Sequence, residues 1–232
     1  MSFSFIVIAA GALYIAWRGT RKSRRAGRNP NNSSVLPPTR AQQSGELGEQ
    51  RTHAALLEVL PQLCGQDFYL HEGALIVEHA PGTAFPTAEI DHLAITPFGV
   101  FVFETKNWSG HISASESDDR LVRTMFDGTR ELRKSPLAQN RSKVAFLRNQ
   151  LPPFWPVSHA GVFTAENVAI DPTLPLNLIK VASLAQWLRT ERQKFGTRRP
   201  VDVRRAKDGV LMYADLAPGA IERHQERVRL SP

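Results

Sequence analysis

The sequence predicts an α/β fold, in which a central mixed β-sheet is flanked by helices and preceded by one membrane-spanning helix. Short apolar runs alternate with segments of helical periodicity across residues 44–196. The two most apolar of these runs, residues 90–95 and 100–103, are rich in β-branched and aromatic side chains, as expected of strands covered on both faces. With 232 residues, 42% of them hydrophobic, the chain can form one substantial domain with attachments.

The membrane helix is predicted from residues 1–17, an uncharged and mostly apolar run at the short end of what spans a bilayer. Basic residues follow this run, whereas a secretory signal carries its positive charge before it, so we expect an uncleaved anchor. Because basic residues stay on the cytoplasmic side, the amino terminus should lie outside a bacterial-type inner membrane and the remaining chain in the cytoplasm. Residues 1–28 would contact lipid, and residues 18–43 would form a basic juxtamembrane segment and flexible linker. The alternative is a buried or peripheral helix.

Charge and cysteine content exclude several classes of function. Seven of the 29 Lys and Arg residues lie in residues 1–40, which contain no acid, so 22 basic and 22 acidic residues remain from residue 41 onward. The net charge of +7 therefore does not by itself indicate nucleic-acid binding. A single cysteine, Cys64, excludes an internal disulfide framework and a cysteine-based zinc cluster, and no His pair has the spacing of a zinc hydrolase.

A predicted hairpin centred on Pro97 and Phe98 brings acidic and basic residues together. Asp91 lies in its first strand, and Glu104 and Lys106 lie in its second, on one face because strand side chains alternate. A two-residue loop would pair positions that sum to 195 and place Asp91 opposite Glu104, where the two could share a divalent cation. A three-residue loop with a compensating bulge is equally compatible with the sequence.

The other elements follow from periodicity and end signals. The first helix should begin after Ser44 as its cap, span residues 46–60, and bury Leu47, Ala54, Leu57 and Leu60. Residues 108–119 should form an exposed connection. Further strands are expected at 68–71, 74–79, 121–126, 159–164, 179–182, 201–205 and 210–213, and further helices at 136–151, 184–195 and 218–229.

Four motifs in chain order resemble a known family. They are Gly45-Glu46-Leu47-Gly48-Glu49, the isolated Asp91, the run from Phe103 to Gly110 containing Glu104-Thr105-Lys106, and Ser135-Pro136-Leu137-Ala138-Gln139. Together they are similar to the nuclease-related domain (NERD) branch of the PD-(D/E)XK nucleases. The resemblance implies a restriction-endonuclease-like sandwich over residues 44–196, with residues 197–232 left as a basic C-terminal extension of unknown role.

The resemblance also implies residue roles. Asp91 and Glu104, with the Thr105 carbonyl and Glu49, would bind Mg²⁺ or Mn²⁺, and Lys106 and Gln139 would complete a catalytic site. Without the resemblance, Glu49 is a solvated acid favoured by the helix dipole and Gln139 an ordinary surface residue. The residues that would contact the phosphate backbone, unless they are simply a solvated helix face, are Arg133, Lys134, Arg141 and Lys143.

Two hypotheses of function result. The first is a membrane-anchored, metal-dependent nuclease that hydrolyses DNA, with RNA not excluded, in DNA processing, uptake or transfer. The second keeps the fold without catalysis, as a membrane-tethered nucleic-acid-binding or scaffold module; the acidic balance of residues 41–188 favours it. A third interpretation of Asp91, Glu104 and Lys106, a buried structural ion network, is energetically expensive in adjacent central strands.

Overall fold

The computed structural model describes residues 39–196 and 199–230 of the chain. The predicted membrane helix and residues 18–38 of the predicted linker lie outside the described residues. Within the described part, no helix combines the length and the apolar character that crossing a bilayer requires.

A mixed five-stranded sheet forms the centre of the domain, with the strand order β1-β4-β5-β9-β11. Its central strand, β5 (Gly99–Lys106), runs antiparallel to β4 (His92–Thr96) and parallel to β9 (Val157–Phe163). The two edges are β1 (Tyr69–Leu70), antiparallel to β4, and β11 (Leu178–Lys180), parallel to β9. This arrangement confirms the predicted α/β fold with a central mixed sheet.

The hairpin register follows the two-residue loop. Thr96 pairs with Gly99 and His92 with Phe103, so Pro97 and Phe98 form the turn. The Thr96 hydroxyl donates to the Gly99 carbonyl at 3.1 Å and accepts from the Phe98 N–H at 3.3 Å, which fixes the turn from inside. The alternative three-residue loop with a bulge is therefore wrong.

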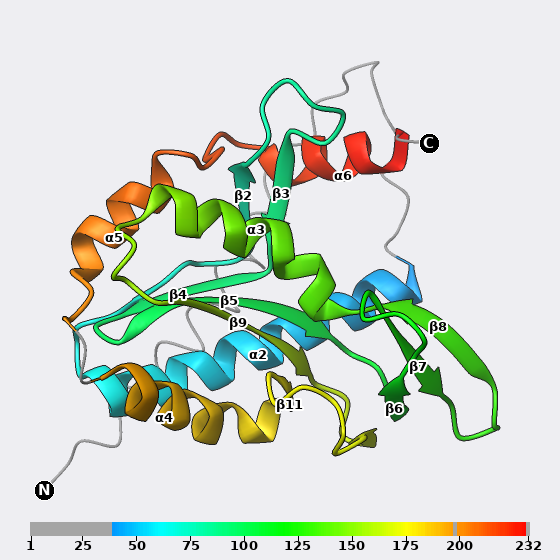
Figure 1. Ribbon diagram of the computed structural model, residues 1–232. Coiled ribbons are helices and arrows are strands. Elements are labelled where there is room, and N and C mark those ends of the chain that lie inside the picture. The colour runs from blue at the N-terminus through cyan, green and yellow to red at the C-terminus, as the bar shows by residue number, and fades with distance from the viewer. Residues whose placement is uncertain (1–38, 197–198, 231–232) are drawn as a thin grey trace, which may run out of the picture. The chain divides into compact units, whose positions relative to one another are not determined.

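Helices cover both faces of this sheet (Figure 1). Helices α2 (Arg40–Cys64) and α4 (Leu184–Phe195) pack on one face, where Phe101 and Phe103 of β5 join their hydrophobic core. Helices α3 (Pro136–Gln150) and α5 (Val203–Leu211) cover the other face, against Val100 and Val102. Because alternate side chains point to opposite faces, β5 contributes to both cores.

Helix α2 begins earlier than its sequence predicts. Thr39 is the N-cap: its hydroxyl accepts from the Gln42 N–H at 3.2 Å, and the Gln42 side chain accepts from the Thr39 N–H at 2.8 Å. This reciprocal pair is a capping box, which satisfies two donors at the helix start. Ser44, the predicted cap, lies inside the helix, and residues 40–43 of the predicted linker are helical.

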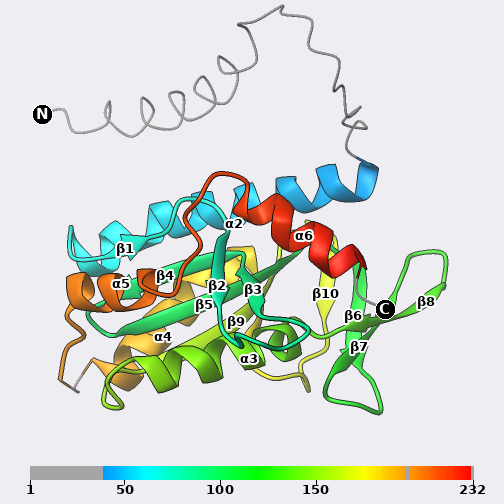
Figure 2. The ribbon, with the colours of Figure 1, turned by 90° about the horizontal axis from the view of Figure 1, so that it is seen from above.

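Two smaller sheets flank the central one. The first pairs β2 (Leu75–Glu78) with β3 (Thr87–Ile90). The second has the order β10-β6-β7-β8 and lies beyond the carboxyl end of β5 in both ribbon views (Figures 1 and 2). Its strands are β6 (Gly110–Ala114), β7 (Arg120–Thr124), β8 (Arg130–Lys134) and β10 (Val168–Ile170). The prediction of an exposed connection at 108–119 is wrong, because β6 pairs with both β7 and β10.

The C-terminal segments pack on the domain. The predicted strands at 201–205 and 210–213 are wrong, because residues 203–211 form α5. Asp202 caps this helix: its side chain accepts a hydrogen bond from the Arg205 N–H at 3.0 Å. Val201, Ala206 and Val210 join the core on the α3 face. The predicted helix at 218–229 is confirmed as α6 (Ala220–Leu230), and a short 3₁₀ helix, η1 (Val181–Ser183), leads from β11 into α4.

Candidate active site

Glu104 is held between two lysines at the carboxyl end of β5. Its Oε1 accepts from Lys106 Nζ and its Oε2 accepts from Lys143 Nζ, each at 2.7 Å. Glu104 is only 4% exposed and Lys143 only 6% exposed. Burial disfavours the carboxylate, but the two ammonium groups outweigh it and lower the pKa of Glu104. This carboxylate is therefore ionised at neutral pH.

Asp91 lies where β3 ends and β4 begins, in the register position opposite Glu104. Its Oδ2 accepts a hydrogen bond from the Thr105 backbone N–H at 2.8 Å. Burial, and then the charge of Glu104, raise the pKa of Asp91 to about 7, more strongly than the two lysines lower it. The hairpin thus brings the two predicted acids together, one ionised and one titrating near neutral pH.

Two further acids are close enough to influence this pair. Burial raises the pKa of Glu49, on α2, to about 7, and the charges of Glu89 and Glu104 add to the effect. The pKa of Glu89, on β3, is also raised, again chiefly by burial and then by Glu104. Four carboxylates therefore share one region with the ammonium groups of Lys106 and Lys143, and the negative charges exceed the positive ones by two when all four acids are ionised.

The chemistry of these donors suits a hard divalent cation, because carboxylate oxygens are the ligands that Mg²⁺ prefers. Their positions are less favourable. Among the described residues, no three His, Cys, Asp or Glu side chains converge closely enough to hold a metal ion. The two oxygens of Glu104 are instead held by lysines. A cation bound through Glu104 would therefore have to use the second lone pair of an oxygen that already accepts from a lysine, or displace that ammonium group.

The remaining predicted site residues lie around this cluster. Thr105 is on β5, and its hydroxyl donates to Thr52 of α2 at 3.0 Å. Gln139 lies in the first turn of α3, half-buried and four residues before Lys143, so the two share one helix face. The predicted start of α3 at Pro136 is confirmed, although the Ser135 hydroxyl makes no capping hydrogen bond.

The four predicted phosphate-binding residues separate into two groups. Arg133 and Lys134 are exposed on β8, and Arg141 is exposed on α3. Arg133 pairs with Glu131 at 2.7 Å, and Arg141 pairs with Asp119 at 2.9 Å. Lys143 does not belong to this exposed group, because α3 turns it inward onto Glu104.

Sequence reasoning missed Glu89 as a site residue and the contact of Lys143 with Glu104. Both carried a signal. Glu89 precedes Asp91 by two residues, the period that places side chains on one face of a strand. Lys143 follows Gln139 by four, the period of one helix face. The position of each relative to Glu104 depends on pairing between distant segments, which the sequence does not encode locally.

Comparison with known proteins agrees with the motifs. A family model described as "Nuclease-related domain" matches residues 44–164, which include most of α2, the β4–β5 hairpin, α3 and β9. Searches of curated proteins and of solved structures found no match to this chain. The matched segment covers just over half of the sequence and contains all four motifs. The chain therefore belongs to the nuclease-related domain (NERD) family.

Proposed function

We propose that this protein is a metal-dependent nuclease that hydrolyses DNA phosphodiester bonds. Family membership already indicates a nuclease-related function at the level of a nuclease-like hydrolase. The observation that supports the finer proposal is the missing positive charge around Asp91 and Glu104. Four carboxylates lie near two lysines, both of which pair with Glu104, and two of the carboxylates, Asp91 and Glu49, have a pKa raised to about 7. A divalent cation has the charge that would balance this region.

In this proposal Asp91 and Glu104 hold Mg²⁺ or Mn²⁺, with the Thr105 carbonyl and Glu49 as further ligands. A bound cation would neutralise charge that develops on the phosphate during hydrolysis. As an ammonium hydrogen-bonded to Glu104, Lys106 would be placed to stabilise the same developing charge; only after losing a proton, as a neutral amine, could it accept one from the attacking water. The Gln139 amide would orient that water, and Lys143 would keep Glu104 in position.

We further propose that residues 1–17 anchor the domain to the inner face of the cytoplasmic membrane, with residues 18–28 on anionic headgroups. The support is the order of the sequence, an apolar run followed by six basic residues. A tether of this kind would suit a nuclease that acts in DNA processing, uptake or transfer.

The test of catalysis is cleavage of DNA by the purified full chain with Mg²⁺ or Mn²⁺. We expect cleavage to stop on chelation and to resume when metal is restored. Glu104→Gln and Lys106→Met should each lower the rate by at least about 100-fold, because the first removes the charge of a proposed metal ligand and the second removes the group proposed to stabilise charge on the phosphate. Glu116→Gln, a change at an exposed acid after β6, is the matched control and should keep wild-type activity.

Thermal unfolding of each variant separates loss of activity from loss of fold. Full cleavage by a folded Glu104→Gln variant, or cleavage that continues without divalent metal, would refute the proposed mechanism.

A non-catalytic binding module on the same fold is the second candidate. The specific observation in its favour is that both oxygens of Glu104 already accept hydrogen bonds from lysines. A protein of this kind would bind DNA equally well before and after Glu104→Gln and would cleave it in neither state.

A further inference from the structure

Helix α6 lies outside the segment matched by the family model. It packs on β2 and β3, beside the four carboxylates of Glu49, Glu89, Asp91 and Glu104, which we call the acid cluster. In both ribbon views it lies over β2 and β3 (Figures 1 and 2). Ala220, His224 and Arg227 recur with helical spacing and form the side of α6 that faces these strands, with Ala220 buried and His224 half-buried. The position of α6 relative to the site is therefore set by this stripe.

Both polar members of the stripe contact the same residue of β3. The Thr87 hydroxyl lies 2.9 Å from Nδ1 of His224 and accepts from Nη1 of Arg227, also at 2.9 Å. Thr87 precedes Glu89 by two residues on the strand, so the two side chains leave the same face. Arg227 is thereby held on the face of β3 that carries a member of the acid cluster.

Electrostatics agree with this placement. Burial lowers the pKa of His224, and the nearby charges of Arg227, Lys143 and His79 lower it further. Lys143 is the lysine that pairs with Glu104 in the site. The inner side of α6 and the lysine of the candidate active site are therefore close enough for their charges to interact.

We propose that α6 forms one wall of the DNA-binding surface and that Arg227 contacts a backbone phosphate of the bound DNA. This inference rests on the proposed function. A cluster of four carboxylates repels a polyanion, so a substrate needs positive charge beside it. Arg227 supplies such a charge from a segment outside the matched family domain.

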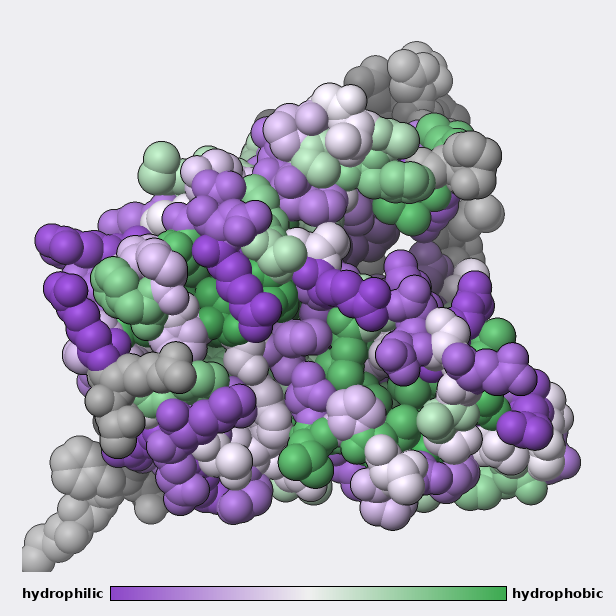
Figure 3. Space-filling view, viewed as in Figure 1, coloured by the Kyte–Doolittle hydropathy of each residue, from purple (hydrophilic) through white to green (hydrophobic). Residues whose placement is uncertain are grey.

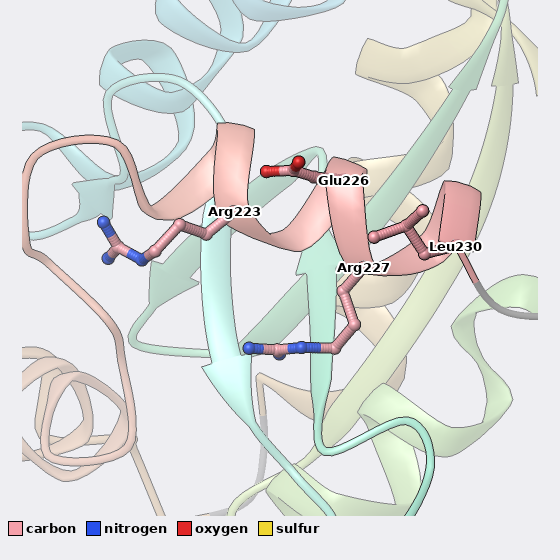
Figure 4. A pocket seen from close by; sticks show the side chains of 4 residues that line it. All are labelled: Arg223, Glu226, Arg227 and Leu230. Atoms are coloured by element: carbon pink, nitrogen blue, oxygen red, sulfur yellow. The ribbon is translucent and has the colours of Figure 1, made fainter.

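The chemistry of arginine suits this role. A guanidinium carries five N–H donors in a planar fork that matches phosphate oxygens, and a hydrogen bond to Thr87 restricts its orientation. Figure 4 shows the Arg227 side chain extending over the strands below α6, in a pocket that Arg223, Glu226 and Leu230 also line. Arg223, one turn earlier, pairs with Asp215 at 2.8 Å. In Figure 3, strongly hydrophilic residues gather below α6, on the part of this surface where α3 runs toward β8.

The test measures how binding of a short fluorescein-labelled DNA duplex by the purified full chain depends on salt, with divalent metal chelated. The slope of log affinity against log salt counts the phosphates that the protein neutralises. Arg227→Ala should weaken binding and reduce the magnitude of that slope by about 1, because one phosphate contact is lost. Arg227→Lys, which keeps the charge, should restore most of the slope.

Arg229→Ala is the matched control, because Arg229 lies on the same helix two residues further on, where the side chain points to a different side. It should leave the slope unchanged. An unchanged slope in Arg227→Ala accompanied by a lower unfolding temperature would show that Arg227 only fastens α6, and would overturn the inference. So would an equal effect of Arg227→Ala and Arg229→Ala, or the absence of salt-dependent binding in the wild-type chain.

Failure of the nuclease proposal gives a different result. If the wild-type chain cleaves no DNA with Mg²⁺ or Mn²⁺, but its binding slope falls in Arg227→Ala, then α6 contacts DNA in a protein that does not hydrolyse it.

Discussion

Half-buried Asp91 and buried Glu104 are neighbouring carboxylates whose pKa values shift in opposite directions. The difference arises from their hydrogen-bond donors: two lysine ammonium groups for Glu104, and a single backbone N–H for Asp91. A charged donor stabilises a buried carboxylate more strongly than a neutral one. Glu104 is thus ionised at neutral pH, while the pKa of Asp91 is raised to about 7.

This difference predicts how stability depends on pH in the metal-free protein. The pKa of Asp91 is raised from 3.8 to about 7 on folding, so the folded state binds the proton more tightly than the unfolded state. The stabilisation that the protonated Asp91 carboxyl group contributes is complete below pH 4 and is lost as the pH rises through 7. Asp91→Asn, which keeps a carbonyl acceptor for the Thr105 N–H, should therefore stabilise the protein at pH 8, by on the order of 1 to 3 kcal/mol.

Chemical denaturation at several pH values between 4 and 8, with a chelator present, measures the effect. The difference in the free energy of unfolding between Asp91→Asn and wild type should increase with pH across this range. Asp118→Asn, at an exposed turn, is the control and should change stability by no more than about 0.5 kcal/mol. A wild-type and an Asp91→Asn profile that run parallel would contradict the prediction.

At the scale of elements, the approach of α2 to the end of the central sheet depends on Gly48. A Cβ at this position would lie 2.9 Å from Thr164 Oγ1 and 3.0 Å from the Asn107 Cβ, closer than normal contacts. Glu49, the next residue, belongs to the acid cluster. The same motif contains Gly45, where a Cβ would meet nothing within 4 Å.

The two glycines of this motif should therefore respond in opposite ways to alanine. Gly48→Ala should force α2 away from Thr164 and Asn107 and destabilise the protein by about 1 to 3 kcal/mol. Gly45→Ala should stabilise it by about 0.5 to 1 kcal/mol, because alanine is the better helix former. Urea denaturation of both variants makes the comparison, and a Gly48→Ala variant as stable as Gly45→Ala would show that α2 does not require this close approach.

The close approach at Gly48 explains why the buried side of α2 agrees only in part with the prediction: Leu60 is buried as predicted, whereas Ala54 is exposed. Leu47 and Leu57 are 45% and 50% exposed, while Gly48, Thr52 and Leu56 face the sheet. The hydrogen bond between Thr52 and Thr105 and the close approach at Gly48 fix the rotation of the helix. Hydrophobic periodicity identified the helix but could not include these two polar and steric constraints.

At the scale of the whole molecule, the predictable part of the site is the part that lies on one hairpin. Asp91, Glu104 and Lys106 follow from a local turn and the two-residue period of strands, so sequence reasoning reached them. Lys143, Glu89 and Arg227 lie on α3, β3 and α6, whose places depend on long-range packing. The strand order of the central sheet is likewise non-local, because β5 pairs with β9 more than fifty residues later.

The core also extends beyond the segment that the family model matches. Residues 44–164 omit β11, α4 and α5. Leu184 and Leu188 complete the core on the α2 face, while Val201 and Val210 complete the core on the α3 face. A chain ending at residue 164 would leave apolar surface exposed on both faces of the sheet.

We therefore expect residues 44–164 alone to lack a cooperative unfolding transition, because neither core is complete. Residues 39–230, which contain both cores, should unfold cooperatively. Circular dichroism during thermal denaturation of the two fragments makes the comparison. A cooperative transition in the shorter fragment would show that α4 and α5 are dispensable for folding.

The two cores that meet on β5 have a consequence for how the protein tolerates change. Glu104 continues directly from Val100–Phe103, four interior residues shared alternately between opposite sides of the sheet. The position of Glu104 is fixed by the packing of these interior residues, so surface connections can vary in length without displacing it. Replacing an interior phenylalanine of β5, Phe101 or Phe103, should by contrast shift the position of Glu104.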